Sequence, residues 1–356
     1  MPELPEVETV RRGLNQYLPG LVVVGTKTYD SPKSFPNSLA DVQAFLIGAS
    51  VTAVRRRAKA LMIDFDSDYS LVIHLKMTGQ LVFIRKEGLA PPLVPEVNSD
   101  TAPLSLELGQ DPRGSANFAP APANRPKSGS EGSTLETQMV GVSPSSKDTA
   151  RFGAGHPSDS LVGELPDRST RASLEFTDGS QLFFNDQRKF GWMRLMPTVE
   201  IAEIDFMKKV GPEPLEDSFT AQVFIERLRR RSGTTIKAAI LDQTVLAGVG
   251  NIYADESLWG AKIHPATRVR DVSDEKLSLL LNEIKTVLLL SIEKGGSTDR
   301  NYVNADGKKG SYIEFARVFR REGLPCRRHP DQLLEKIRVA SRGTHVCPVC
   351  QPSPND

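Results

Sequence analysis

The spacing of apolar residues changes once along the chain, and this change most constrains the fold. Between residues 21 and 196 apolar residues alternate or occur in short β-branched runs separated by Gly, Asp and Ser, which is typical of successive strands. After VGPEPLEDSF, at 210–219, they recur every three or four residues, as in FTAQVFIERLRRR, which is typical of amphipathic helices. The chain has 356 residues, more than one typical domain. The pattern therefore predicts an α+β protein with an antiparallel β domain followed by a helical domain.

The strand pattern is interrupted between Lys86 and Arg168. This stretch holds eleven prolines and only two aromatic residues, Phe118 and Phe152, so it has too little apolar surface to offset the entropy of ordering it. We expect residues 86–168 to form a disordered, low-complexity insertion. The strand pattern resumes at 171–196, where TDGS predicts a hairpin turn, so the insertion interrupts a single β domain.

The three cysteines lie in the last 31 positions. Cys326 and His329 form a Cys-x-x-His pair, and Cys347 and Cys350 form a Cys-x-x-Cys pair, which together supply four ligands of the types that zinc prefers. Two alternatives stay open: His345 is the fourth ligand, or the second pair alone binds a metal. Although the net charge is only +1, residues 300–351 hold eleven basic and five acidic residues, which suits a partner with phosphate groups.

The N-terminal stretch MPELPEVETV combines a helix start with a reactive group. Pro5 suits the first helical position, acidic residues suit the positive end of the helix dipole, and the apolar spacing predicts a helix over 5–18. If Met1 is removed, Pro2 becomes a secondary amine that can act as a nucleophile. Glu3 would then be placed to move protons, and Glu6 to hold the helix start. The alternative is that both prolines only shape the helix entry.

The segment LAGVGNIYADES, at 246–257, predicts a tight turn followed by a helix. Gly248 and Gly250 permit the turn, and Asn251 opens the helix, so backbone N–H groups and the Asn251 amide could face an anion. Alternatively, the same residues are explained by the packing of two helices without a ligand. No stretch approaches the length of an apolar membrane span, and the N-terminus lacks the basic and apolar regions of a signal peptide. We expect a cytoplasmic protein with no membrane partner.

Six motifs in order resemble the formamidopyrimidine-DNA glycosylase family. They are PELPEVE at the N-terminus, RRAK at 56–59, HLKMTG at 74–79, DQRKFG at 186–191, GVGNIYADE at 248–256 and the cysteine-rich tail. The resemblance implies an N-terminal antiparallel β-sandwich with flanking helices at 1–198, a hinge at 199–213, a helix-two-turn-helix domain at 214–311 and a zinc-finger β-hairpin at 312–356. It implies a monomeric base-excision-repair enzyme that removes oxidised purines from double-stranded DNA and then cleaves the strand by β,δ-elimination.

The resemblance also assigns roles to individual residues. Pro2 matches the nucleophile, Glu3 the general acid, and Lys59 a lysine near the lesion phosphate. The residues that match DNA-binding positions are Met77, Arg188 and Phe190, which fill the space of the flipped base, and Lys237, Asn251 and Arg342, which bind phosphates. One structural zinc is implied at Cys326, His329, Cys347 and Cys350, with His329 where the family has a cysteine. The alternatives are the related endonuclease VIII branch, which acts on oxidised pyrimidines, and a DNA-binding module without catalysis.

Overall fold

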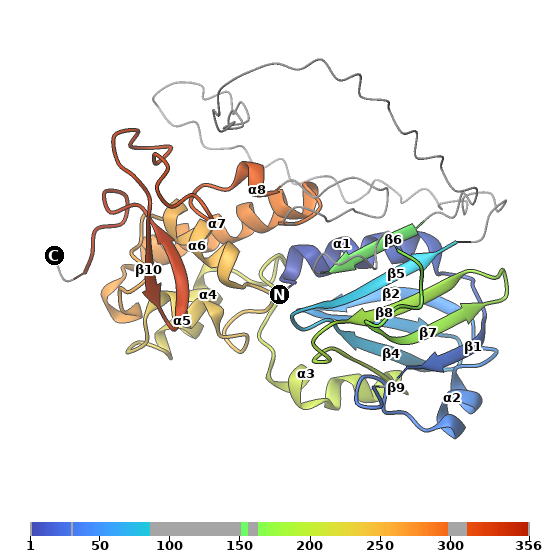
Figure 1. The fold of residues 1–356 in the computed structure, drawn as a ribbon. Helices are drawn as coiled ribbons and strands as arrows, with labels where there is room; N and C mark the ends of the chain where they lie inside the picture. The colour runs from blue at the N-terminus through green and yellow to red at the C-terminus, as the bar shows by residue number, and fades with distance from the viewer. Residues whose placement is uncertain (1, 30, 86–150, 156–162, 298–311, 355–356) are drawn as a thin grey trace, which may run out of the picture.

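A computed structural model describes residues 2–29, 31–85, 151–155, 163–297 and 312–354, with only the backbone described for 151–155. A β domain and a helical domain lie side by side, and the N-terminus lies where they meet (Figure 1). The first helix, α1 (Leu4–Tyr17), has Pro5 in its first turn, as its sequence predicts. One face of α1 carries Val7, Val10 and Leu14 into the core of the β domain. Helix α1 is therefore packed on the β domain.

The β domain is a sandwich of two antiparallel sheets, as expected. One sheet has the order β2-β3-β4-β9 and the other β1-β7-β8-β5-β6, and side chains such as Leu61, Ile73, Phe83 and Phe184 fill the space between them. A short helix, α2 (Leu39–Phe45), follows β1. The strands are β1 (Val23–Thr28), β2 (Val51–Arg57), β3 (Ala60–Phe65), β4 (Tyr69–His74), β5 (Gly79–Ile84), β6 (Arg151–Gly155), β7 (Thr170–Phe176), β8 (Gln181–Asp186) and β9 (Trp192–Pro197).

Strand β6 shows that the prediction of a disordered insertion over 86–168 is wrong for residues 151–155. Its backbone pairs antiparallel with β5, from Gln80 opposite Gly155 to Ile84 opposite Arg151. Leu165 also belongs to the fold, because it packs against Val82 and Phe183 on the outer face of the sheet. The stretch between β5 and β6 is thus a long connection between two neighbouring strands. Residues 86–150 and 156–162 lie outside the described residues.

The segment between the domains is folded onto the β domain. It contains a 3-10 helix, η2 (Thr198–Glu203), and the short helix α3 (Asp205–Lys209). Ile201 in η2 is buried against Met62 and Val72 on the outer face of the four-stranded sheet. The predicted hinge at 199–213 is therefore attached to one domain by apolar packing over its first part.

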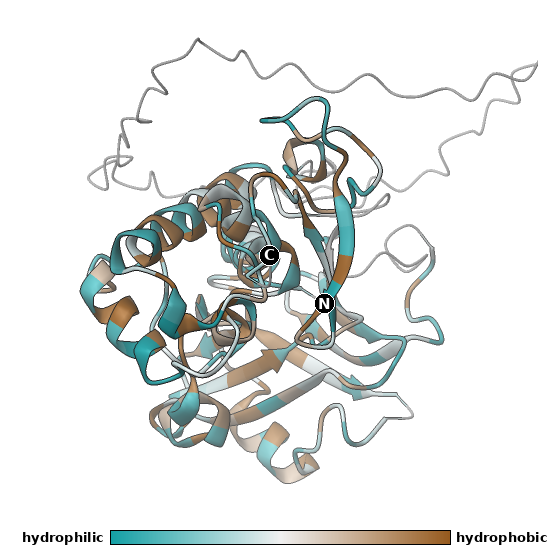
Figure 2. Cartoon of the chain, turned by 90° about the vertical axis from the view of Figure 1, so that its left-hand side faces the viewer, coloured by the Kyte–Doolittle hydropathy of each residue, from teal (hydrophilic) through white to brown (hydrophobic). Residues whose placement is uncertain are grey.

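The helical domain contains α4 (Ala221–Arg229), α5 (Ile236–Leu241), α6 (Asn251–Gly260), the short η3 (Val269–Asp271) and α7 (Asp274–Glu293). Ser273 caps the N-terminus of α7, because its side chain accepts a hydrogen bond from the Lys276 backbone N–H. Figure 2 shows both hydrophobic and hydrophilic residues along these helices. Their buried apolar side chains, such as Phe224, Ile240 and Leu281, form one core. None of the described helices is long and apolar enough to cross a membrane.

The C-terminal tail is a small module that packs on α6. It contains α8 (Tyr312–Phe315) and a hairpin of β10 (Glu335–Val339) and β11 (Arg342–Val346). The carboxylate of Glu256, which is fully buried in α6, accepts backbone N–H bonds from the three consecutive residues Arg317, Val318 and Phe319. This carboxylate fixes the start of the module to the helical domain.

Candidate functional site

The N-terminal segment lies against the glycine turn before α6. The Leu4 N–H donates to the Gly248 carbonyl at 3.0 Å, and the Ile252 N–H donates to Glu3 Oε1 at 3.2 Å. A Cβ added at Gly250 would lie 2.2 Å from the carboxyl carbon of Glu3, so only glycine permits this approach. The turn is formed as predicted, but the anion at the start of α6 is the carboxylate of Glu3 itself.

Glu3 carries an unusual carboxylate. Its residue is 4% exposed, and its Oε2 atom is buried with no hydrogen-bond partner among the described residues. Burial raises the pKa of Glu3 to about 7, although the nearby charge of Lys59 acts in the opposite direction. Near neutral pH this carboxyl group can therefore both hold and release a proton, as a general acid must.

Lys59 lies beside Glu3, at the turn between β2 and β3. Its residue is 6% exposed, and its Nζ donates to the Val249 carbonyl at 3.0 Å. Burial lowers the pKa of this amine, while the charge of Glu3 raises it. The structure thus brings together the predicted residues Glu3 and Lys59, with the buried Pro2 next to Glu3 in the chain.

Glu6 holds the start of α1, as expected. Its Oε2 accepts the Glu3 backbone N–H at 2.8 Å, which completes a capping box. Its Oε1 accepts hydrogen bonds from the Tyr253 hydroxyl and from the N–H and hydroxyl of Ser297, the latter two at 2.8 Å. Sequence analysis missed Tyr253 and Ser297, because their partner lies about 250 or more residues away in the chain. Glu6 therefore connects the N-terminus to α6 and to the end of α7.

Met77, Arg188 and Phe190 form a cluster at the tips of two neighbouring loops of the β domain. Met77 is 41% exposed and Phe190 is 53% exposed. Arg188 donates from Nη1 to the Met77 sulfur at 3.2 Å, and its guanidinium carbon lies 4.9 Å from the centre of the Phe190 ring. The buried carboxylate of Asp186 shapes the second loop by accepting the Gly191 and Arg188 N–H groups at 2.6 and 3.2 Å. The three predicted residues thus form one exposed apolar and cationic projection.

Lys237 differs from its prediction as a direct phosphate ligand. Its side chain is fully buried, and its Nζ bonds to Asp255 Oδ1 and Thr344 Oγ1 at 2.6 Å each. Because the amine is enclosed, Lys237 joins α5 to α6 and to the hairpin instead of facing solvent. Sequence cannot separate an exposed lysine from a buried one whose partners are distant in the chain.

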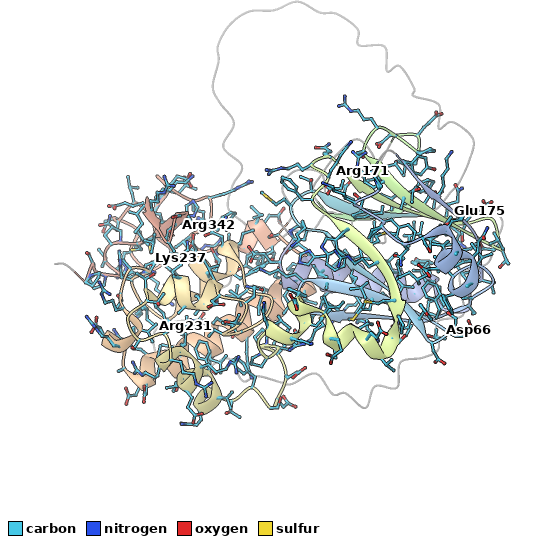
Figure 3. The ribbon with its side chains drawn as sticks, turned by 90° about the horizontal axis from the view of Figure 1, so that it is seen from below. Asp66, Arg171, Glu175, Arg231, Lys237 and Arg342 are labelled. Carbon is cyan, nitrogen blue, oxygen red and sulfur yellow. The ribbon has the colours of Figure 1, made fainter. Side chains whose placement is uncertain are left out.

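Asn251 and Arg342 lie near Lys237. Asn251 Nδ2 donates to the Gly343 carbonyl at 3.0 Å, while its Oδ1 is buried and has no partner in the described ranges. Arg342 is exposed at the start of β11, and its guanidinium makes no hydrogen bond or ion pair with the other described residues. Lys237 and Arg342 are labelled in Figure 3, which shows them in the helical part of the molecule. The phosphate roles of Asn251 and Arg342 stay predictions.

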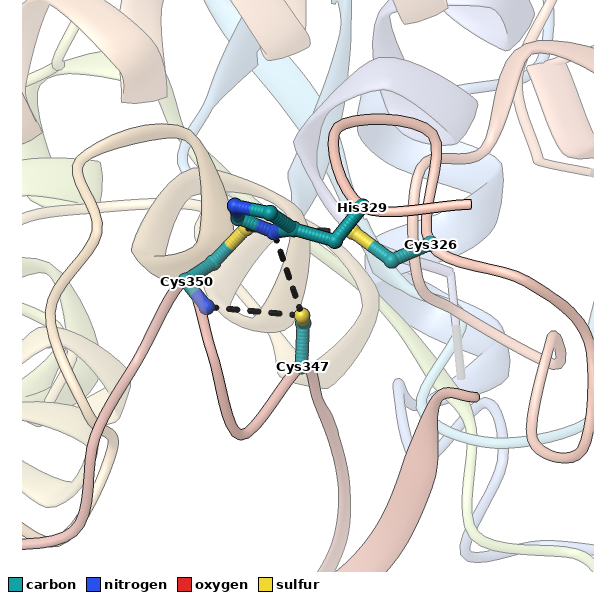
Figure 4. Close-up of side chains that lie close together, drawn as sticks. All are labelled: Cys326, His329, Cys347 and Cys350. Atoms are coloured by element: carbon teal, nitrogen blue, oxygen red, sulfur yellow. Dashed lines mark hydrogen bonds between the residues drawn. The ribbon is translucent and has the colours of Figure 1, made fainter. Parts of the chain in front are cut away.

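The four predicted metal ligands meet in one place (Figure 4). The Sγ atoms of Cys326, Cys347 and Cys350 and a ring nitrogen of His329 all lie within 4.8 Å of one another. The Cys326–Cys350 Sγ distance is 3.7 Å, close to the roughly 3.8 Å between sulfurs in a tetrahedron with Zn–S bonds of about 2.3 Å. The residues present therefore fit a tetrahedral metal ion.

His345 is not the fourth ligand. Its Nδ1 lies 3.1 Å from Asp255 Oδ2, and its backbone N–H donates to the same oxygen at 2.9 Å. Asp255, which sequence analysis also missed, thus accepts bonds from both Lys237 and His345. It links the helical domain to the hairpin through a fully buried carboxylate.

Known proteins that resemble this chain match it along nearly its whole length. Residues 1–117 match the formamidopyrimidine-DNA glycosylase N-terminal domain, and residues 210–302 match the H2TH domain of the same family. The formamidopyrimidine-DNA glycosylase of Herpetosiphon aurantiacus is 35% identical over 352 residues, covering 99% of this chain and 100% of the relative. That of Pediococcus pentosaceus is 34% identical, covering 99% of each chain.

The chain belongs to the formamidopyrimidine-DNA glycosylase family. Solved structures of this family are similar throughout. A Lactococcus lactis Fpg variant in complex with DNA containing Fapy-dG has a TM-score of 0.71 and 28% identity, covering 99% of this chain and 100% of that one. The Lactococcus lactis Fpg bound to DNA containing an abasic site has a TM-score of 0.71 and 27% identity, with the same coverage.

Proposed function

We propose that this protein is a bifunctional DNA glycosylase and AP lyase of base excision repair. It removes oxidised purines, chiefly 8-oxoguanine and formamidopyrimidines, from double-stranded DNA and then cleaves the strand by β,δ-elimination. Family membership supports the glycosylase activity, and the site supports the finer assignment. The similar Lactococcus lactis proteins were solved with Fapy-dG and abasic-site DNA, which are a substrate and an intermediate of this reaction.

One observation carries the proposal: within the part of the chain that the structure describes, the carboxylate of Glu3 has a buried oxygen without a hydrogen-bond partner. An unpaired buried oxygen is costly for folding alone, so its retention suits a group that pairs with a substrate. Its pKa of about 7 suits a general acid at neutral pH. The neighbouring Pro2 and Lys59 supply an amine and a cation at the same place.

The proposed reaction begins at the N-terminus. Removal of Met1 frees the Pro2 nitrogen, whose lone pair attacks the sugar C1′ of the damaged nucleotide. The electron pair of the bond from C1′ to the base leaves with the base, which takes up the proton that the Pro2 nitrogen loses. Glu3 donates its proton to the sugar ring oxygen, and the ring opens to leave an iminium between Pro2 and C1′. Lys59 stabilises negative charge on the DNA backbone beside the lesion. Loss of a C2′ proton from this iminium then starts the elimination that cleaves the strand.

The Met77, Arg188 and Phe190 cluster supplies what access to C1′ requires. A base inside the duplex must leave the stack, at a cost of a few kcal/mol, before its sugar can be attacked. Met77 and Phe190 are large, exposed and apolar, which suits insertion between bases, and the Arg188 guanidinium suits pairing with the orphaned cytosine.

The tail is proposed to hold DNA phosphates, with Arg342 and Asn251 as direct ligands. One zinc ion at Cys326, His329, Cys347 and Cys350 would close the module, which is too small to fold on its own apolar core. The proposed enzyme is a monomer that acts on chromosomal DNA in the cytoplasm.

Substrate choice tests the proposal against its nearest alternative. Matched duplexes with 8-oxoguanine or with thymine glycol are incubated with the protein, and released base and strand cleavage are measured separately. We expect faster release of 8-oxoguanine. Preference for thymine glycol would move the chain to the endonuclease VIII branch, and DNA binding without base release would show a catalytically inactive module.

A further inference from the structure

The turn that carries Lys59 has a conformation that its sequence does not favour. Ala58, between β2 and β3, has a φ of 53°, in the left-handed region that residues with a Cβ rarely adopt. Ala58 is fully buried, so the turn cannot relax into solvent. The pairing of Arg57 with Ala60 imposes a two-residue hairpin turn, which favours a positive φ that alanine adopts only at a cost. A contact from outside the turn can offset this cost.

The carboxylate of Glu213 holds this turn. Glu213 lies in the segment between the domains and is 5% exposed. Its Oε1 accepts the Ala58 N–H at 2.5 Å and Arg57 Nη1 at 3.1 Å, and its Oε2 accepts Arg56 Nη1 at 2.9 Å. Arg56 Nη1 also donates to the Ala58 carbonyl at 2.9 Å. Both backbone polar groups of Ala58 are thus tied, directly or through Arg56, to one carboxylate.

The opposite end of Lys59 is held by the helical domain. Its Nζ donates to the Val249 carbonyl at 3.0 Å, and the same carbonyl accepts Gln243 Nε2 at 2.8 Å. The segment that carries Glu213 is fixed to the same loop, because the Gly211 N–H donates to the Gln243 carbonyl at 2.7 Å. Lys59 therefore spans the two domains, with Glu213 at its backbone and Val249 at its amine.

We propose that Glu213 is a positioning residue for Lys59: by holding the left-handed turn at Ala58, it directs the Lys59 amine into the site beside Glu3. The inference rests on the function proposed above. The simpler role would be structural only, as one member of an ion cluster with Arg56 and Arg57. A positioning role predicts that loss of Glu213 lowers the rate of base release more than an equally destabilising substitution elsewhere does. A structural role predicts equal effects on the rate.

The test uses Glu213→Gln in the full-length protein, with Glu216→Gln as the matched control from the same segment. Glu216 is exposed, so its substitution changes the same charge without reaching the turn. We measure the single-turnover rate of 8-oxoguanine release at saturating protein, the Kd for a duplex with a tetrahydrofuran abasic analogue, and thermal stability. We expect Glu213→Gln to lower the rate about tenfold or more while the Kd changes less than about threefold. Glu216→Gln should match the wild type.

Two further variants separate positioning from stability. Leu174→Ala creates a cavity in the core of the β domain, in the sheet that does not carry the turn, and it should lose comparable stability without loss of rate. Ala58→Gly combined with Glu213→Gln should recover part of the rate, because glycine adopts a positive φ without an external clamp. Should Glu213→Gln fail to fold, Glu213→Asp keeps the charge but withdraws it from Ala58, and the same loss of rate is expected.

The outcomes distinguish this inference from the proposed function. A wild-type rate for Glu213→Gln, or an equal loss of rate in Leu174→Ala, would overturn the positioning role. An unchanged rate in Lys59→Met would instead contradict the proposed function, because the lysine itself would not be needed. Loss of activity in Lys59→Met together with a fully active Glu213→Gln would contradict only the inference.

Discussion

Replacing Glu3 with glutamine should abolish base release and yet stabilise the protein at pH 8. The pKa of Glu3 rises from an ordinary value of 4.5 to about 7, chiefly because burial disfavours the charged form. Below pH 4.5 the carboxyl is protonated in both the folded and unfolded states, so it has no effect on stability. Between pH 4.5 and 7 the unfolded chain releases the proton while the folded chain retains it, so stability falls as pH rises.

The magnitude follows from the shift. At about 1.4 kcal/mol for each pH unit, the full cost in the folded wild type is about 3 kcal/mol above pH 7. Glutamine cannot ionise, and its carbonyl can still accept the Ile252 N–H. The free energy of unfolding of Glu3→Gln, relative to the wild type, should therefore increase by about 2 to 3 kcal/mol between pH 5 and pH 8.

Urea unfolding followed by tryptophan fluorescence at both pH values measures this difference. Glu8→Gln is the control, because Glu8 lies in the same helix and its pKa is lowered to about 2. Burial alone would raise that value, but the hydrogen bonds and charges of Arg11, Arg12 and Arg56 outweigh it. Its carboxylate therefore contributes stability that is present above pH 4.5 and lost as pH falls towards 2, so Glu8→Gln should lose the same stability at pH 5 and pH 8. An effect of Glu3→Gln that does not change with pH would refute the reasoning.

Three other predictions concern Lys237, the exposed pair Met77 and Phe190, and the metal site. Lys237→Met leaves Asp255 buried without its cation and should lower the free energy of unfolding by about 3 to 5 kcal/mol. The double variant Lys237→Met with Asp255→Asn should recover part of this loss, and thermal unfolding of the two variants measures the difference. Substituting alanine for both Met77 and Phe190 removes exposed apolar side chains, so the affinity for lesion duplexes should fall in fluorescence-anisotropy titrations. The melting temperature should stay within about 2 °C of the wild type, as is usual for surface positions. Removing the metal with a chelator should release about one zinc per chain and abolish DNA binding, because a single tetrahedral site closes the tail. Metal-free protein that binds DNA with full affinity would contradict the zinc assignment.

The sequence predicts those parts of the fold that depend on local patterns. Apolar spacing locates α1 and α4, and turn residues locate the TDGS hairpin, because each forms from residues close together in the chain. Strand β6 was missed because Arg-Phe-Gly-Ala-Gly has one large apolar residue and no alternation. It forms because its backbone pairs with the edge of β5, and no pattern of residue types predicts this pairing.

The site shows the same division. Residue types and spacing are enough to suggest Pro2, Glu3 and the metal ligands, and the family resemblance adds Lys59 and the Met77, Arg188 and Phe190 cluster. The burial of Lys237 and the contact of Glu213 with Ala58 depend on partners more than one hundred residues away. Such contacts exist only once the two domains and the tail have packed together, and a single sequence does not specify them.

Covalent trapping at the N-terminus tests the central claim most directly. The protein is incubated with an 8-oxoguanine duplex and sodium borohydride, which reduces an iminium to a stable bond, and the adduct is mapped by peptide mass spectrometry. We expect a DNA-linked peptide that begins at Pro2, and none from protein whose N-terminus is acetylated or retains Met1. An adduct that forms as well with a blocked N-terminus, or that maps to a lysine, would contradict the proposed mechanism.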